Sequence, residues 1–446
     1  MREAVTAIFV YEHEVFIIRR QNYLRAFPGY YAFPGGKVDQ EDSDYSYTDP
    51  LLTPYPARWI RALFREVHEE LGFDLEQAVA QGHVNTIDRF GEAITPPFEP
   101  VRFNAHYFKI EMNQRPDLTV DEGEIAWSGW VDHKELHRLY CAGEALMVVP
   151  TMYTVKELAE DINAISSEQF NLEYDVNGEL PYMELLCGVG MIPVPSNTLP
   201  PAKATNALLL GDEHVQCYLV DPSPESEEVY QRLFETLKQH RVDGIFITHH
   251  HHDHHELAPK LACELEVPLR CSAKTRDLML DRQGSDYLDG VNLQPIEEGE
   301  VLTTWLGQPV RCYALPGHDA GMLGLAPDSM AWFFITDLAQ YGATVVIPSR
   351  EGNMQHYFES LERVIALKPK VLIPSHGMPM GGTLLAEKTL QHRLEREQQI
   401  KGYLDQGLDA EAIVEQIYQD VNPRLLPLAL QNVKQHMKKL GVVIEE

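Results

Sequence analysis

The sequence predicts a multidomain protein of mixed α/β and α+β class that ends in a helical domain. A chain of 446 residues is too long for one ordinary hydrophobic core, so two or three domains are expected. The first 160 residues mix strands with one amphipathic helix, residues 205 to 385 alternate between strand-like and helix-like segments, and the end is rich in helix. Within the alternating region we expect helices over Glu225–His240, Asp253–Leu265 and Met354–Leu367 and a strand over Val371–Pro374. We therefore place domains at 1–160, 185–385 and 386–446, with 161–184 as the linker.

The composition is typical of a globular protein in the cytoplasm. Apolar residues make up 44% and charged residues 23% of the chain, and no apolar run approaches the roughly 18 residues that span a bilayer. The first ten residues read as a strand and make a poor signal peptide. Six scattered cysteines without a Cys-x-x-Cys pair fit reduced thiols. A net charge of −30 opposes nonspecific binding to RNA, and we expect no contact with membranes.

A group of carboxylates lies on the predicted helix of the first domain. Glu66, Glu69 and Glu70 are related by i+3 and i+4, which places them on one side of the helix, while apolar residues at helical spacing occupy the other side. Crowded carboxylates repel one another unless a cation neutralises them, and Mg²⁺ prefers such oxygen ligands. A solvated acidic face is the alternative.

This helix and the turn before it resemble the Nudix box, Gly-x5-Glu-x7-Arg-Glu-x2-Glu-Glu-x-Gly. The matching residues are Gly36, Arg65, Glu66, Glu69, Glu70 and Gly72. Asp42 stands where the box has its first Glu, and the usual gap of seven residues is 22 residues long here, from 43 to 64. The insert at 43–56 is either a loop that covers or selects a substrate or a tolerated surface insertion.

Segments around the box are similar to those of coenzyme A diphosphatase-like Nudix proteins, among them residues 25–39, 95–97 and 101–108. The resemblance implies an α/β/α sandwich and cleavage of a nucleoside-linked diphosphate that depends on Mg²⁺ or Mn²⁺. It implies that Glu66 and Glu70 bind metal, that Glu69 is a ligand or orients water, and that Glu124 adds a carboxylate. The candidates for substrate binding are Arg20, Gly35, Gly36 and Arg65. A solvated edge arginine is the alternative for Arg20.

A run of metal-ligand residues follows the predicted strand Val242–Ile247. Residues 248 to 254 read Thr-His-His-His-His-Asp-His, and the pattern His-x-His-x-Asp-His within it is formed by His249, His251, Asp253 and His254. Imidazoles and a carboxylate that leave one strand together can converge on a pair of divalent ions. Three further candidates, His318, Asp337 and His376, each follow a strand-like segment, which a run of solvated histidines does not explain.

Residues 185 to 385 resemble the metallo-β-lactamase fold, an αββα sandwich. The resemblance implies one metal site from His249, His251 and His318 and a second from Asp253, His254 and His376, with Asp337 as the bridge. It implies two zinc ions, or iron and manganese in their place, and we expect Asp253 also to take part in catalysis. His250, His252 and His255 are read as neighbours of the site. Thr336 and Ser375 replace glycines that commonly precede ligands in this family.

The last domain resembles the winged-helix tail of lactamase-beta-like-2 proteins, on residues 391–400, 417–418 and 433–440. Some of those proteins cut single-stranded RNA, whereas their glyoxalase-II-like relatives hydrolyse thioesters. The tail carries 8 Lys and Arg against 10 Asp and Glu, which is unusual for a nucleic-acid module. Its alternative role is to cap the domain or to build a homodimer.

Three functions remain open at this point. The first is a bifunctional hydrolase, in which a Nudix domain acts on a nucleotide or coenzyme A-type substrate and the second domain hydrolyses a thioester or other ester. The second is an endoribonuclease with a nucleotide-processing Nudix domain, which the charge disfavours. In the third, the Nudix domain is a nucleotide sensor that regulates its neighbour.

Overall fold

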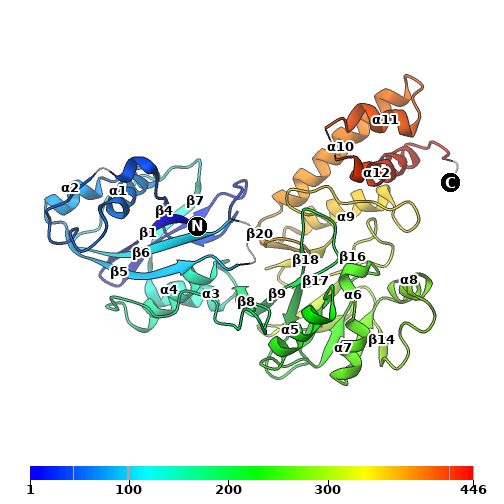
Figure 1. The fold of residues 1–446 in the computed structure, drawn as a ribbon, viewed down its shortest axis with the longest axis horizontal. Helices are drawn as coiled ribbons and strands as arrows, with labels where there is room; N and C mark the ends of the chain where they lie inside the picture. The colour runs from blue at the N-terminus through cyan, green and yellow to red at the C-terminus, as the bar shows by residue number, and fades with distance from the viewer. Residues whose placement is uncertain (44, 98–100, 421, 445–446) are drawn as a thin grey trace. The chain divides into compact units, whose positions relative to one another are not determined.

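The computed structural model describes residues 1–43, 45–97, 101–420 and 422–444 (Figure 1). It divides into two compact units. The first comprises Met1–Glu173 and Met183–Cys187, and the second comprises Tyr174–Tyr182 and the chain from Gly188 onward. Each unit has its own hydrophobic cores. Within the described residues, no helix has both the length and the apolar character to cross a bilayer.

The first unit is built on one mixed sheet with the strand order β3-β2-β1-β6-β5, in which β4 also pairs with β1 and β7 with β2. Its strands are β1 Arg2–Tyr11, β2 Glu14–Arg20, β3 Tyr31–Ala32, β4 Gly35–Lys37, β5 Val84–Ile94, β6 Phe103–Met112 and β7 Ile125–Asp132, and the short strand β8 Met183–Leu186 also belongs to this unit. Strands β1 and β6 pair in parallel, whereas β2 pairs antiparallel with β1, β3 and β7, β4 with β1, and β5 with β6. Both faces of the sheet are covered by apolar cores.

Helices cover the two faces of this sheet (Figure 1). On one face lie α1 Ala57–Leu71 and α2 Leu75–Ala80, and on the other lie α3 His133–Cys141 and α4 Val149–Glu160, while the 3₁₀ turn η1 spans Gln40–Ser43. The apolar stripe of α1 predicted from the sequence is buried against the sheet. The helix ends at Gly72, which adopts the left-handed conformation (φ 60°) and donates its N–H to the carbonyl of His68.

The second unit contains two sheets. One has the order β14-β13-β12-β11-β10-β9, and its strands are β9 Val189–Pro195, β10 Ala204–Leu210, β11 Tyr218–Val220, β12 Gly244–Phe246, β13 Leu269–Cys271 and β14 Leu293–Pro295. The other has the order β15-β16-β17-β18-β19-β20, and its strands are β15 Val301–Trp305, β16 Gln308–Ala314, β17 Leu323–Pro327, β18 Phe333–Thr336, β19 Val371–Pro374 and β20 Met380–Gly381. Strands β11 to β14 are parallel.

Helices pack on the outer faces of both sheets, as a layered α/β domain requires. The first sheet is covered by α5 Glu227–Leu237, α7 Ala258–Glu264 and α8 Ala273–Gln283, and the second by α9 Met354–Leu367 and the start of α10. Residues Ala207 and Leu209 of β10 pack toward the helices, whereas Leu208 and Leu210 are buried on the opposite face. The backbone N–H of Asn206 bonds the carbonyl of Ser375 at 2.7 Å, joining the two sheets.

Two of the predicted helices differ from those observed. The helix predicted over Asp253–Leu265 is broken into α6 His252–His255 and α7, because Leu257 adopts a left-handed conformation (φ 58°) and Pro259 restricts the start of the next helix. The helix predicted over Glu225–His240 is shorter, since Ser226 caps α5 by accepting from the N–H of Val229.

The end of the chain is helical, as the sequence predicts. It consists of α10 Leu384–Leu404, α11 Ala410–Ile417, the 3₁₀ turn η2 Pro423–Leu425 and α12 Leu426–Lys439. These helices share a small core in which Ile400, Ile413, Val433 and Met437 are buried. In Figure 1 this helical end forms the orange and red part of the chain, beside α9.

Candidate metal centre

The predicted ligands of the second unit all follow strands, at the carboxyl ends of β12, β16, β18 and β19. His249 to His254 come after β12, His318 after β16, Asp337 directly after β18 and His376 shortly after β19. Strands of two facing sheets thus deliver the ligands to one edge of the sandwich, where sites of α/β proteins are usually built.

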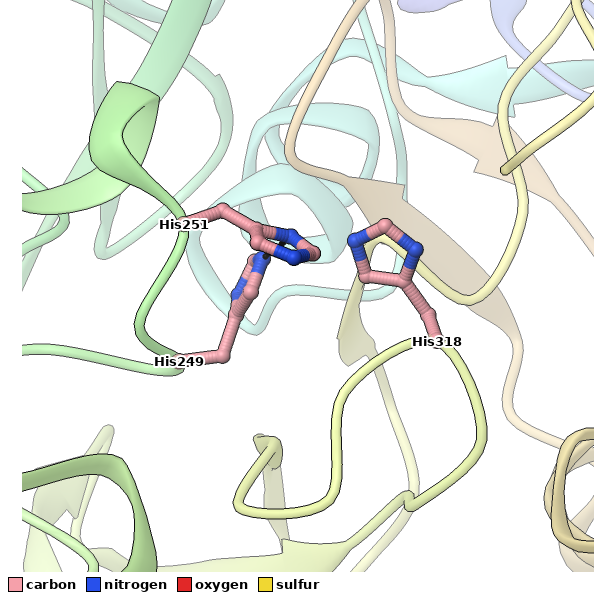
Figure 2. A group of neighbouring side chains, drawn as sticks. All are labelled: His249, His251 and His318. Atoms are coloured by element: carbon pink, nitrogen blue, oxygen red, sulfur yellow. Dashed lines mark hydrogen bonds between the residues drawn. The ribbon is translucent and has the colours of Figure 1, made fainter. Parts of the chain in front are cut away.

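Three imidazoles form the first group. Figure 2 shows His249 and His251 on one loop and His318 on another, with the three rings turned toward one another. The Nε2 atom of His249 lies 3.1 Å from Nδ1 of His251, and one ligand atom from each of the three residues lies within 4.8 Å of the others. His249 and His318 are buried. This geometry brings together the three residues expected at one metal.

A second group contains Asp253, His254 and His376, again with ligand atoms within 4.8 Å. Asp337 lies between the groups: its Oδ2 is 3.5 Å from Nε2 of His254 and 3.6 Å from Nε2 of His318, and its Oδ1 is 3.4 Å from Nε2 of His376. Ligands about 2.1 Å from a tetrahedral ion lie about 3.4 Å from one another. The separations are therefore those of atoms that share cations.

Unpartnered buried atoms point to the same conclusion. Within the described part of the chain, Nε2 of His254, Nε2 of His318 and Oδ1 of Asp337 are buried and have no hydrogen-bond partner. A buried polar atom without a partner is costly, and a cation at this position would satisfy all three. The residues thus fit a binuclear metal site.

Four of the five candidate ligand imidazoles are oriented by a bond to the ring nitrogen that faces away from the cluster, an arrangement common around metal sites. The partners are Thr248 Oγ1 for His249 (3.0 Å), Asp221 Oδ2 for His254 (2.9 Å), the carbonyl of Val346 for His318 (2.6 Å) and the carbonyl of Ala204 for His376 (2.9 Å). Because one nitrogen of each of these four rings is engaged outside, the other is left to face the centre.

Asp221 is a residue that sequence reasoning missed as part of the site. It is fully buried at the end of β11 and accepts hydrogen bonds from the N–H (2.8 Å) and hydroxyl (2.7 Å) of Thr248 in addition to its contact with His254. The signal in the sequence was an acidic residue directly after a buried strand. Asp221 lies beside the histidine run because β11 pairs in parallel with β12, so the residues that follow the two strands are neighbours.

A second outer group surrounds His250 and His251. His250 contacts Asp319 through Nδ1, and the Nε2 atom of His251 lies 3.6 Å from Oε1 of Glu351. Glu351 also forms an ion pair with Arg282 at 2.8 Å. His250, His251 and Asp319 are a further group that could hold a metal ion. No local pattern in the sequence marks Asp319 or Glu351, because both come from other loops.

The other histidines of the run lie beside the centre. His255 is buried, with its Nδ1 2.7 Å from the hydroxyl of Tyr287 and its Nε2 2.8 Å from the carbonyl of His250. His252 is largely exposed and pairs with Glu256 at 3.2 Å. Neither histidine belongs to a candidate metal group among the described residues, and their role as neighbours of the site stays a prediction.

Electrostatics favour the metal-binding forms of two ligands. Burial, with help from neighbouring histidines, lowers the pKa of His249, so its imidazole stays neutral. Burial alone would raise the pKa of Asp337, but His376 and His254 hold it well below its usual range. Burial likewise opposes charge on His254, yet the carboxylates of Asp337, Asp253 and Asp221 raise its pKa well above normal. A cation at the centre would take the place of that proton.

The two departures from the family pattern lie at the base of the centre. Thr336 is fully buried and adopts a left-handed conformation (φ 49°), which is strained for a β-branched residue and explains why glycine is common there. Ser375 is fully buried, and its carbonyl accepts from Asn206 at 2.7 Å. Asp337 and His376, which follow these two residues, lie 3.4 Å apart in the ligand cluster.

The carboxylates of the first unit differ in their surroundings. Glu70 is buried (7% exposed), and its Oε2 accepts the backbone N–H of Gly35 at 3.0 Å. Gly36 leaves room for Glu66, since a Cβ atom there would lie 2.4 Å from that carboxylate. Arg65 donates to Glu66 at 2.9 Å and to the carbonyl of Lys37 at 2.8 Å. Gly35, Gly36 and Arg65, predicted to bind substrate, therefore contact and position the carboxylates.

The remaining candidates of this unit lie around Glu70. Arg20 and Glu124 are close enough to shift its pKa in opposite directions, but burial dominates and raises the pKa of Glu70 to about 8. Glu69 is 58% exposed and pairs with Arg65 at 3.3 Å, so it does not converge with the other two. The four three-residue clusters found among the described residues all lie in the second unit.

Asp42 and the insert are tied to α1. Asp42 is buried and its Oδ2 accepts from Arg65 at 3.0 Å. In the insert, the ring of Tyr45 lies 4.3 Å from the guanidinium of Arg61, and Tyr47 packs edge-on against Phe64. Residue 44 of the insert lies outside the described residues.

Comparison with known proteins identifies the second unit. The profile of the metallo-beta-lactamase superfamily matches residues 200–376, which include all seven predicted ligands. The chain carries a metallo-β-lactamase domain. The profile of the beta-lactamase associated winged helix domain matches residues 410–441, so the predicted winged-helix tail is confirmed. The fold of this domain implies a binuclear metal site, and the chain is an enzyme of the hydrolase class.

Similar proteins include the beta-lactamase-like protein 2 homolog of Drosophila melanogaster, 29% identical over 53% of this chain and 82% of that protein. A hydroxyacylglutathione hydrolase of Edwardsiella ictaluri is 30% identical to this chain, and the aligned region covers 37% of this chain and 58% of that relative. A beta-lactamase domain protein from Burkholderia ambifaria shares the fold, with a TM-score of 0.51 and 20% identity over 61% of this chain and 92% of that one.

One further solved structure shows a more distant similarity. A Nudix hydrolase from Alicyclobacillus acidocaldarius covers 37% of this chain and 93% of its own, with 22% identity and a TM-score of 0.31. The interpretation of the first unit therefore depends on its own residues.

Proposed function

We propose that the chain is a bifunctional metal-dependent hydrolase. The metallo-β-lactamase domain hydrolyses a thioester or other ester, and the first unit cleaves a nucleoside-linked diphosphate, for example coenzyme A or acyl-coenzyme A. The observation that carries the proposal is the convergence of seven candidate ligand side chains, three of which, His254, His318 and Asp337, each have a buried atom without a hydrogen-bond partner.

At the histidine-rich site, the side chains of the protein would hold two metal ions and fix their positions. Two zinc, iron or manganese ions would supply activated water and polarise a carbonyl group. His249, His251 and His318 would hold one ion and Asp253, His254 and His376 the other, with Asp337 placed between them. Hydrolysis adds water across the C–S or C–O bond of the substrate, which leaves a carboxylate and a thiol or an alcohol.

At the carboxylate helix of the first unit, the burial of Glu70 supports the proposal that a cation binds there. The pKa of about 8 for Glu70 means that burial opposes its charge, and a bound cation would keep it ionised. Mg²⁺ or Mn²⁺ would neutralise phosphate oxygens and activate water. Glu66 and Glu70 would hold the metal, Glu124 and Arg20 lie close to Glu70, and Glu69 is exposed for contact with water or substrate.

Acyl-coenzyme A tests both activities of the full-length protein in one experiment. We expect release of free thiol, detected with a thiol reagent, and of 4′-phosphopantetheine products, detected by mass spectrometry. Asp253→Ala should abolish thiol release alone, and Glu70→Gln should abolish diphosphate cleavage alone. Glu76→Gln, on an exposed part of α2, is the matched control. If neither product forms with metal-loaded protein, the proposal is wrong for this substrate.

The winged helix and the homolog of beta-lactamase-like protein 2 favour one second candidate, cleavage of single-stranded RNA. The net charge of −30 opposes it. RNA cleavage that is lost in Asp253→Ala would establish this candidate. Nucleotide binding without turnover in Mg²⁺ would instead make the first unit a sensor.

A further inference from the structure

A large cavity opens above the metal ligands of the second unit. Its volume is about 1070 Å³, and His251, His318, Asp337 and His376 line one part of it. Pockets for small molecules range from about 300 to 1,000 Å³. The cavity can therefore hold much more than the ester group that reacts at the ligands.

The tail supplies an apolar wall of this cavity. Tyr418, Leu425, Leu428 and Ala429 line it from the end of α11, η2 and α12. Leu425 and Leu428 are three residues apart and share a face, whereas the tail's own core is formed on another face around Val433. These leucines are half-buried and lie in the cavity lining.

The wall is fixed to the metal centre through the loop between β18 and α9. Asn432 of α12 accepts the N–H of Ile347 at 2.8 Å, and Gln435 donates to the carbonyl of Pro348 at 2.8 Å. The adjacent carbonyl of Val346 is the partner of His318. Because tail, loop and ligand are joined by direct hydrogen bonds, the apolar wall keeps a defined position relative to the reacting group.

The arginines in the described lining of the cavity are paired with carboxylates, which disfavours binding of a polyanion. The described lining includes Arg282 and Arg350, and each already has a carboxylate partner at 2.8 Å, Glu351 and Asp281 respectively. Recognition of nucleic acid needs cations that are available to phosphate. Besides these paired charges, the lining includes neutral polar side chains, the histidines of the centre and the apolar wall from the tail.

We propose that this cavity is an acyl-binding site, in which the tail leucines contact the alkyl chain of a thioester or ester substrate whose carbonyl group lies at the metal ligands. This inference rests on the proposed esterase function and names its substrate class. Water attacks the acyl carbon. In a thioester the C–S bond breaks and the products are a fatty carboxylate and a thiol, and in an ester the C–O bond breaks and the products are a fatty carboxylate and an alcohol. Each methylene buried in the cavity should improve kcat/KM about fourfold.

The test uses full-length, metal-loaded protein and thioesters of N-acetylcysteamine with acetyl, butyryl, hexanoyl and octanoyl groups. These substrates share one thiol, so only the chain length changes. We expect kcat/KM to rise by about an order of magnitude for each two-carbon extension. Leu428→Ser should lower kcat/KM for octanoyl at least tenfold more than for acetyl, and Leu425→Ser should act in the same direction.

Leu394→Ser, on an exposed part of α10, is the matched control and should leave the chain-length dependence intact. Metal content and melting temperature are measured for every variant, so that a misfolded protein is recognised. Equal hydrolysis of all chain lengths, or an equal loss for all of them in both leucine variants, would overturn the proposal.

Binding of octanoate and acetate, measured by calorimetry, separates this inference from the proposed function. Octanoate binding that Leu428→Ser weakens, without hydrolysis of any thioester, would support the acyl site and reject the esterase activity. Absence of octanoate binding would overturn the acyl site even if acetyl thioester is hydrolysed. Displacement of octanoate by a single-stranded RNA oligonucleotide at physiological salt would also overturn it.

Discussion

We predict that Asp221 orients His254, a candidate metal ligand, and that replacing Asp221 with asparagine tests this role alone. The carboxylate accepts the N–H and hydroxyl of Thr248 and pairs with Nδ1 of His254 at 2.9 Å, all in a fully buried position. Asparagine has nearly the same shape, but it carries no charge and offers only one acceptor oxygen. Its NH₂ group must face either Thr248 or His254, so at least one of these bonds is lost.

The expected size of the effect follows from these contacts. A hydrogen bond to a charged group contributes about 1.5–3 kcal/mol. Loss of an outer partner of a metal-binding histidine typically lowers metal affinity about 10–100-fold, which corresponds to about 1.4–2.8 kcal/mol. The two estimates agree, so we expect Asp221→Asn to bind the metal held by His254 about 10–100-fold more weakly.

The assay is competition with a chelator, followed by metal analysis of the protein. The matched control is Asp212→Asn. Asp212 also accepts three hydrogen bonds, from Thr304, Leu306 and Gly307 at 2.6–2.8 Å, but it lies outside the metal centre. Asp212→Asn should lower stability without changing metal affinity. If Asp221→Asn keeps its metal at the same chelator concentration as the wild type, the proposed orienting role is wrong.

Three further predictions concern the same unit. Asn432→Ala leaves the buried N–H of Ile347 without a partner, so we expect the free energy of unfolding to fall by about 1–3 kcal/mol. Amide hydrogen exchange in α12 should become faster. Unchanged exchange would refute the contact. Burial alone would raise the pKa of Glu397, but His436 and Lys439 lower it, so its charge stabilises the fold at neutral pH and this contribution disappears as the pH falls through the lowered pKa. Glu397→Gln should therefore speed exchange in α12 at pH 7 and match the wild type at strongly acidic pH. Removal of metal by a chelator should lower the melting temperature, since metal at 100 times its Kd contributes about 2.7 kcal/mol; an unchanged melting temperature would show that no metal is bound.

Much of the metal centre could be predicted from the sequence because its ligands are encoded locally. The run from His249 to His254 places four ligands on one loop, and His318, Asp337 and His376 each follow a strand. The helix Met354–Leu367 and the strand Val371–Pro374 were also predictable, since their apolar patterns are continuous and their ends are marked by residues that cap or break structure.

The carboxylate helix shows where such reasoning stops. Spacing alone places Glu66, Glu69 and Glu70 on one side, yet Glu70 is buried while Glu69 is mostly exposed. The difference comes from the turn at Gly35, whose N–H reaches only Glu70. Helical periodicity gives the direction of a side chain, but the neighbouring segment decides whether it meets protein or water.

The candidate metal ligands could thus be named from the sequence, because ligand chemistry resides in residue types and their local spacing. Their orientation was decided by the tertiary structure, since the partners of His254 and His251, namely Asp221 and Glu351, come from loops far away along the chain. The same holds for the apolar wall of the cavity, to which Leu428 contributes. Contacts of this kind depend on which strands pair and where the tail packs, and no local pattern carries that information.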